Sequence, residues 1–271
     1  MQPEQDERVT TTPTPTTADV RAFWERNPVA AAAIASPPGS REFFEAFDRL
    51  RLVAEPAWVQ EEIYAFDRFR GKRVLDVGCG NGYVLSRYAC HDARTYGIDL
   101  TQAAVELSRK RFALAGLNGD FVQSDAERLP FQGGMFERVV SVGVLHHIPS
   151  IESAISEIHR VLTPGGSFAL MLYHRNSLHY RLLYPLYGVL HPQFRGHRPP
   201  DVARRIDGAD NPIGRTFSRR QVRQLLKAFG RVELRVRSLP IRPVLRVPGG
   251  GPLLDLFSRW LGWFLYARAV K

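Results

Sequence analysis

The sequence has few of the features that mark secreted or membrane-spanning proteins. It contains only two cysteines, Cys79 and Cys90, which cannot form a disulfide framework, and no C-x-x-C pair or His/Cys cluster indicates a zinc site. No run of about 18 apolar residues is present, so no segment is expected to span a membrane. The N-terminus is polar and acidic, unlike a signal peptide. We therefore expect a cytoplasmic protein without a bound metal.

Acidic residues are scarce in the last third of the chain. Residues 1–170 contain 18 Lys and Arg against 22 Asp and Glu, a net charge of −4. Residues 171–271 contain 19 against 5, a net charge of +14. A basic surface of this size attracts phosphates, nucleic acid or anionic lipid. It can equally be a solvated, arginine-rich face, and both interpretations stay open at this point.

Composition and hydropathy divide the 271 residues into five predicted parts. Residues 1–19 are rich in Thr, Pro and acids and are expected to form a disordered tail. Residues 20–70 are predicted to form an N-terminal helical segment, whose aromatic stripe either packs in the core or lines a substrate site. Residues 71–175 are predicted to form a ligand-binding core, residues 176–215 a basic cap or lid, and residues 216–271 the C-terminal part of the fold.

The most informative stretch is an apolar run that is followed by three alternate glycines, Val74–Gly82. The run reads as a buried parallel strand, and the next residues, Tyr83–Tyr88, have helical spacing. Such a strand, glycine turn and helix make a nucleotide-type site. Asp76 stands two residues before the first glycine, where a carboxylate would repel a pyrophosphate and attract an ammonium or sulfonium group. A cationic nucleoside therefore fits better than a dinucleotide, and a tight turn without any ligand is the third interpretation.

Two further predicted strands also end in an acid. Arg94–Asp99 places Asp99 where nucleotide-binding α/β folds have an acid that accepts hydrogen bonds from both ribose hydroxyls. Asp120–Asp125 places Asp125 where it could accept from an adenine amino group. Because parallel strands end at the same edge of a sheet, we expect these acids to lie close together.

The remaining segments continue the alternation of strands and helices. Strands are expected at residues 137–144 and 167–172, and helices at 101–115 and 150–162. The pattern predicts an α/β fold: a Rossmann-like, doubly wound, mostly parallel sheet with helices on both faces. Three histidines and a tyrosine follow the fourth and fifth strands. They are candidates for a general base or for orienting a substrate, and each could instead pack or cap a helix: His146, His147, His174 and Tyr173.

Five motifs occur in an order and spacing that resemble the class I S-adenosylmethionine-dependent methyltransferases, nearest to their small-molecule and quinone-type branch. The motifs are Val74–Gly82, Gly97–Asp99, Ser124–Phe131, Leu145–His147 and Arg160–Gly166. The resemblance implies S-adenosyl-L-methionine as cofactor, bound by the core of residues 71–175. It also implies an antiparallel last strand. The residues implied to hold the cofactor are Asp76, Gly78, Cys79, Gly80, Asn81, Gly82, Asp99, Leu100, Asp125, Ala126, Ser141 and Val142.

The family usually has Asp where this chain has Glu137, a position that is normally structural. Past the fifth strand, residues 176–193 have helical spacing, and residues 195–215 read as a mobile loop. A helix is expected from Thr216 to Gly230, then an alternating strand at Arg231–Arg237. Residues 261–270 could supply the last strand, although residues 253–266 could instead form a helix that lies on a membrane.

The sequence thus predicts methyl transfer to an O, N or C nucleophile of a small or lipid-like molecule. His146, His147 or His174 would serve as the base and Tyr173 would orient the acceptor. An anionic acceptor and a peripheral membrane contact would both match the basic last third. An RNA methyltransferase is less favoured, since no Asn-Pro-Pro-Tyr-like motif follows the fourth strand and no RNA-binding module is visible. A protein that binds the cofactor without catalysis is the remaining alternative.

Overall fold

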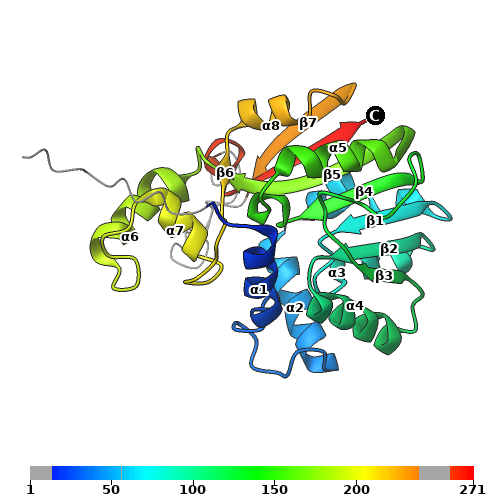
Figure 1. Ribbon diagram of the computed structural model, residues 1–271, viewed down its shortest axis with the longest axis horizontal. Coiled ribbons are helices and arrows are strands. Elements are labelled where there is room, and N and C mark those ends of the chain that lie inside the picture. The colour runs from blue at the N-terminus through cyan, green and yellow to red at the C-terminus, as the bar shows by residue number, and fades with distance from the viewer. Residues whose placement is uncertain (1–13, 56, 238–256) are drawn as a thin grey trace, which may run out of the picture.

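The computed structural model describes residues 14–55, 57–237 and 257–271, and within these ranges the chain forms one mixed sheet with helices around it (Figure 1). The strand order is β3-β2-β1-β4-β5-β8-β7, and the short β6 pairs with β5. All pairs among β1 to β6 are parallel, whereas β8 is antiparallel to both β5 and β7. The predicted sheet with an antiparallel last strand is confirmed. The strands are β1 Arg73–Val77, β2 Arg94–Asp99, β3 Asp120–Gln123, β4 Phe136–Val142, β5 Leu162–His174, β6 Thr216–Phe217, β7 Arg231–Arg237 and β8 Phe264–Val270.

Helices cover both faces of the sheet because its central strands are apolar on both sides. Leu75 and Val77 of β1 pack into one core with α5 and α8, whereas Val74 packs into a second core with α2, α3 and α4. The α-helices are α1 Thr17–Arg26, α2 Arg41–Ala54, α3 Tyr83–Ala89, α4 Gln102–Ala115, α5 Ile151–Val161, α6 Tyr184–Leu190, α7 Pro199–Arg205 and α8 Arg219–Leu225. Shorter helical turns are η1 Val59–Tyr64, η2 Phe66–Phe69, η3 Leu145–His147 and η4 His179–Leu183.

Two polar contacts tie β4 to its surroundings. The Arg138 guanidinium is 1% exposed and donates to the Ser167 hydroxyl at 3.1 Å and to the backbone carbonyls of Ile63 and Tyr64. These bonds fix the segment before β1 against the sheet. The neighbouring Glu137 carboxylate accepts from the Arg73 backbone N–H at 2.8 Å and from its guanidinium at 3.1 Å. Glu137 is therefore built into the pairing of β4 with β1.

Several elements differ from the sequence-based expectation. The helix expected before β1 is split into η1 and η2, because Ala65 adopts a left-handed backbone with φ of 51°. Strand β5 begins at Leu162, before the strand expected at 167–172, and its register with β4 shifts along the added residues. The expected mobile loop at 195–215 contains α7, whose buried Val202 and Ala203 anchor it.

The ends of the chain also differ in detail. Helix α1 begins at Thr17, inside the stretch expected to be a tail, because Thr16 and Asp19 form a capping box. Residues 1–13 of that stretch lie outside the described residues. The helix expected over 216–230 is preceded by β6 and reduced to α8. A continuous membrane-lying helix over 253–266 is wrong, since residues from Phe264 belong to β8; residues 253–256 lie outside the described residues.

The insertion after β5 forms a lobe beside the sheet, at the left of Figure 1. It packs around a small aromatic core that joins α6 and α7 to the end of β5 and to Trp263. Among the described residues, no helix is long and apolar enough to cross a membrane.

Candidate functional site

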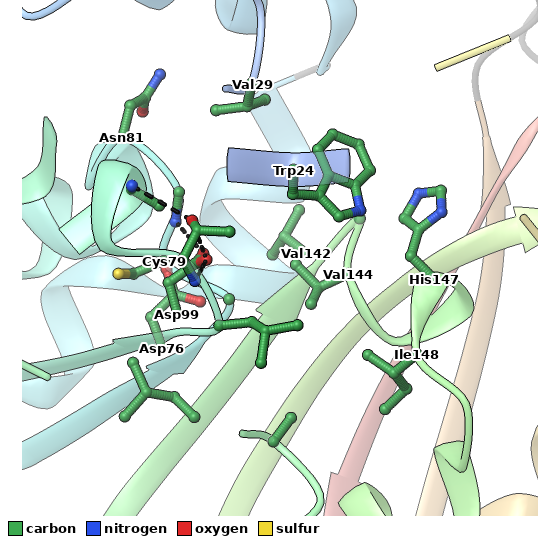
Figure 2. Close-up of a pocket in the computed structure, with 18 of the residues that line it drawn as sticks. Trp24, Val29, Asp76, Cys79, Asn81, Asp99, Val142, Val144, His147 and Ile148 are labelled. Carbon is green, nitrogen blue, oxygen red and sulfur yellow. Dashed lines mark hydrogen bonds between the residues drawn. The ribbon is translucent and has the colours of Figure 1, made fainter. Parts of the chain in front are cut away.

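A cavity opens at the carboxyl ends of β1, β2 and β4, beneath the N-terminal helix α1 (Figure 2). In Figure 2, Asp76 and Asp99 lie on one side of the cavity, and Trp24 and His147 lie on the other. Eleven of the residues proposed from the sequence line it: Asp76, Gly78, Cys79, Gly80, Asn81, Asp99, Leu100, Asp125, Ala126, Val142 and His147.

The glycine loop packs tightly against neighbouring protein atoms. The backbone N–H groups of Gly78 and Cys79 both donate to the Ile98 carbonyl, at 2.8 and 2.9 Å. Gly78 has φ of +83°, and a Cβ atom there would lie 2.4 Å from Cγ2 of Val144. The absence of a side chain thus lets the loop approach Val144, which itself lines the cavity.

The Asp99 carboxylate is held in one orientation by the loops around it. Its Oδ2 accepts from the Gly80 N–H at 3.1 Å, and its Oδ1 accepts from the Thr101 N–H at 3.0 Å and the Thr101 hydroxyl at 2.8 Å. Burial raises the pKa of Asp99, and the hydrogen bonds from Thr101 and Gly80 act in the opposite direction. A carboxylate fixed in this way presents its remaining lone pairs to the cavity.

Asp76 is a buried acid with an oxygen that accepts no hydrogen bond from the described residues. Its side chain is 2% exposed, and its Oδ1 atom has no hydrogen-bond partner among the described residues. Burial raises the pKa of Asp76 well above its ordinary value, and the nearby Asp99 raises it further. A cationic group in the cavity would offset both effects.

Helix α1 forms a wall of the cavity. The sequence alone did not determine whether the aromatic residues of the N-terminal helical segment pack in the core or line a site. Trp24 and Val20 of this helix, together with Val29 beyond it, line the cavity. The Glu25 carboxylate holds α1 in place, because it accepts from the Gln102 and Ala103 N–H groups at 3.0 and 2.9 Å. These are free amides at the N-terminus of α4, where a negative charge is stabilised.

His147 is the one predicted base that reaches the cavity. Its ring lies 5.1 Å from that of Trp24. Its Nδ1 atom is 2.6 Å from the Ile213 carbonyl oxygen, which only accepts, so we assign the ring proton to Nδ1. Its Nε2 atom faces Oδ2 of Asp207 at 3.6 Å. Burial lowers the pKa of His147, and Asp207 raises it in part.

The other predicted catalytic and substrate residues lie outside the cavity lining. His146 is fully buried between His147 and Tyr173, with ring centroids 4.0 Å from each. His174 is buried at the end of β5, where its Nδ1 lies 3.1 Å from the Gly262 carbonyl oxygen. The Tyr173 hydroxyl donates to Asp207 at 2.9 Å, and its ring centroid lies 6.1 Å from that of His147.

Two of the proposed cofactor residues also have structural partners instead of cavity contacts. The Ser141 hydroxyl is buried and donates to the Val77 carbonyl at 2.8 Å, across the sheet. Gly82 precedes α3, and a Cβ atom there would lie 3.1 Å from the Ser108 backbone. Asp125 does line the cavity, and one of its oxygens accepts from the Glu127 N–H at 2.9 Å.

His146, His147 and Asp207 offer ligand atoms that all lie within 4.8 Å of one another. These are residue types that bind transition metals. Two of the three residues also have hydrogen-bond partners in the protein: the Ile213 carbonyl for His147 and the Tyr173 hydroxyl for Asp207. The absence of a metal therefore stays a prediction.

Residues 75–170 match the methyltransferase domain family. The phthiotriol/phenolphthiotriol dimycocerosates methyltransferase of Mycobacterium tuberculosis is 44% identical over 100 residues, 36% of each chain. The fatty-acid O-methyltransferase of Mycolicibacterium smegmatis is 41% identical over 104 residues, again 36% of each chain. A solved structure, Haemonchus contortus phosphoethanolamine N-methyltransferase 2 in complex with S-adenosyl-L-methionine, superposes with a TM-score of 0.61 at 17% identity, over 93% of this chain and 60% of that one. The matches span 36% of the length of these two curated relatives, and the structural likeness shows the fold.

Proposed function

We propose that the chain is an S-adenosylmethionine-dependent methyltransferase that acts on a lipid-like acceptor, on the basis of the match of residues 75–170 to the methyltransferase domain family. The observation that carries the proposal is the pair of acids in one cavity. Asp99 is oriented by three hydrogen bonds, and Asp76 is buried with an unpartnered oxygen. A ligand that joins ribose hydroxyls to a cationic end would satisfy both.

The residues present fit S-adenosylmethionine. Asp99 would accept from the ribose hydroxyls, and Asp76 would compensate the charge of the ammonium group. Asp125, Ala126 and Leu100 would surround the adenine, and the backbone of Gly78 and Gly80 would lie along the methionine part. When bound, this cofactor supplies a methyl group that is already activated as part of a sulfonium.

His147 would receive the proton that the acceptor loses. Its Nδ1 atom is engaged by the Ile213 carbonyl, so the neutral ring has its free lone pair at Nε2. Burial keeps the pKa of His147 below its ordinary value, which favours the neutral form before reaction. After Nε2 takes the proton, the Asp207 carboxylate at 3.6 Å would stabilise the cation. Trp24 would cover the reacting groups and exclude water.

A lipid-like acceptor is supported by the apolar side of the cavity. Trp24, Val29, Val142, Val144 and Ile148 line the same cavity as His147. The two curated relatives with 41–44% identity are named for lipid acceptors, a phthiotriol dimycocerosate and a fatty acid. RNA as the acceptor, or cofactor binding without transfer, would be alternative outcomes of the test below.

The test is transfer of a labelled methyl group from S-adenosylmethionine to a panel of acceptors: long-chain fatty acids, lipid alcohols and total RNA. We expect label in a lipid fraction. With a lipid alcohol as acceptor, whose hydroxyl loses a proton, we expect His147→Asn to lower kcat by about 100-fold or more, since a general base contributes a factor of this size. His91→Asn, which changes a histidine at the end of α3, is the control and should leave kcat unchanged. Label in RNA alone, or no label with any acceptor despite cofactor binding, would contradict the proposal.

A further inference from the structure

The outer face of the segment His179–Leu190, which comprises η4 and α6, is apolar and uncovered. Leu182, Leu186, Val189 and Leu190 are 58%, 46%, 66% and 68% exposed. Their spacing of four, three and one residues places them on one side of the helical segment. Figure 1 shows α6 in the lobe that projects away from the sheet. We call these four side chains the apolar stripe.

Rotation of the segment about its axis would not bury the stripe, because it would expose the opposite face, which is already packed. Tyr184 is 1% exposed and contacts Trp263 with ring centroids 5.3 Å apart. Tyr187 stacks on Phe194 at 6.2 Å. A helix that is apolar on all sides is normally enclosed by protein or lies in a membrane. Here one side is enclosed and the other is open.

Four exposed arginines lie within the apolar stripe's segment or close to it in the sequence. Arg175, Arg181, Arg195 and Arg198 are exposed, and within the described ranges none of them forms an ion pair with a carboxylate. Between residues 171 and 206 the sequence contains six arginines and one acid, Asp201. The charge excess of the last third is thus concentrated in part beside the stripe.

We propose that the apolar stripe and its four arginines form a surface that binds anionic lipid bilayers. An apolar helix face inserts at the boundary between head groups and acyl chains, and flanking arginines pair with anionic head groups. A second copy of the chain fits less well, because a stripe-to-stripe contact would bring eight arginines together (two sets of four) without acids to offset them. Such a surface would lie at the boundary between head groups and acyl chains.

The test is sedimentation of the full chain with vesicles of phosphatidylglycerol and phosphatidylcholine in equal parts, and with vesicles of phosphatidylcholine alone. No methyl donor or acceptor is added, so the result is independent of the proposed reaction. We expect binding to the mixed vesicles that weakens as salt is raised. Leu186→Asp combined with Leu190→Asp should reduce the partition coefficient about tenfold or more, because it places charge in the apolar face.

Two further variants separate the proposal from a folding defect. Leu114→Asp places one such charge on an exposed leucine of α4, which is 41% exposed, and should leave vesicle binding unchanged. Arg181→Glu combined with Arg195→Glu keeps the stripe and should weaken binding to the mixed vesicles selectively. The proposal is overturned if the wild type does not bind the mixed vesicles or if the leucine pair behaves like Leu114→Asp. It is also overturned if the stripe variants change the oligomeric state and not the vesicle binding.

Discussion

A single methyl group added at Gly78 should destabilise the fold more than the same group added at Gly71. Both glycines have a left-handed backbone, with φ of +83° and +70°. This conformation costs an L-residue about 1–2 kcal/mol. At Gly71 a Cβ atom meets nothing within 4 Å, whereas at Gly78 it lies 2.4 and 2.5 Å from the two Cγ atoms of Val144. Such overpacking costs about 1–3 kcal/mol more.

We therefore expect Gly71→Ala to lower the free energy of unfolding by about 1–2 kcal/mol and Gly78→Ala by about 2–5 kcal/mol. Urea unfolding monitored by tryptophan fluorescence measures both values. Val144→Ala in the Gly78→Ala background should restore part of the loss, with a coupling of about 1 kcal/mol or more. Equal costs at Gly71 and Gly78, or the absence of coupling to Val144, would refute the claim that the loop is packed against Val144.

Three other predictions concern the cavity. Burial raises the pKa of Asp76, so the carboxyl becomes neutral as pH decreases, and affinity for S-adenosylmethionine should then fall. Calorimetry should show that affinity depends less on pH in Asp76→Asn than in the wild type. The same pH dependence in both proteins would contradict the pairing of Asp76 with the cation. Glu25→Ala removes the carboxylate at the N-terminus of α4 and should weaken cofactor affinity about 3–30-fold, whereas Glu106→Ala should not. Equal effects of the two substitutions would contradict the claim that Glu25 holds α1 over the cavity. Dialysis against EDTA should leave methyl transfer unchanged, and activity restored by zinc would instead assign a metal to His147 and Asp207.

The central part of the fold could be predicted because its signals are local. The strand, the glycine turn and the helix of residues 74–88 are specified by adjacent residues, and β1 and α3 occupy the expected positions. Asp76, Asp99 and Asp125 line one cavity because parallel strands end at a common edge. Helix α4 was also predictable, since Thr101 caps it and Gly116 ends it in the left-handed conformation.

The sequence could not determine which histidine faces the cavity. His146 and His147 are consecutive residues of the short turn η3, so their side chains point in different directions. Only the packing of Tyr173 and Trp24 fixes which ring is buried and which reaches the cavity. His174 follows Tyr173 on β5, and because side chains alternate along a strand, the two point to opposite faces of the sheet.

The walls above the cavity depend on contacts between distant segments. Helix α1 is held over the site by hydrogen bonds that the Gln102 and Ala103 N–H groups donate to Glu25, which lies more than 70 residues earlier in the sequence. Asp207 comes from a stretch of residues that reads as a loop, and it reaches His147 because the insertion packs on Tyr173. A Cβ atom at the adjacent Gly208 would lie 2.6 Å from the Phe23 ring, so the insertion and α1 meet directly.

The most direct measurement is calorimetric titration of S-adenosylmethionine into the wild type and into Asp99→Asn, with the exposed Asp120→Asn as matched control. The wild type and Asp120→Asn should bind equally. Asp99→Asn should bind about 10–150-fold more weakly, because it replaces one charged acceptor oxygen whose hydrogen bond is worth about 1.5–3 kcal/mol. A folded wild type that does not bind, or an Asp99→Asn variant that binds like the wild type, would contradict the assignment of this cavity to the cofactor.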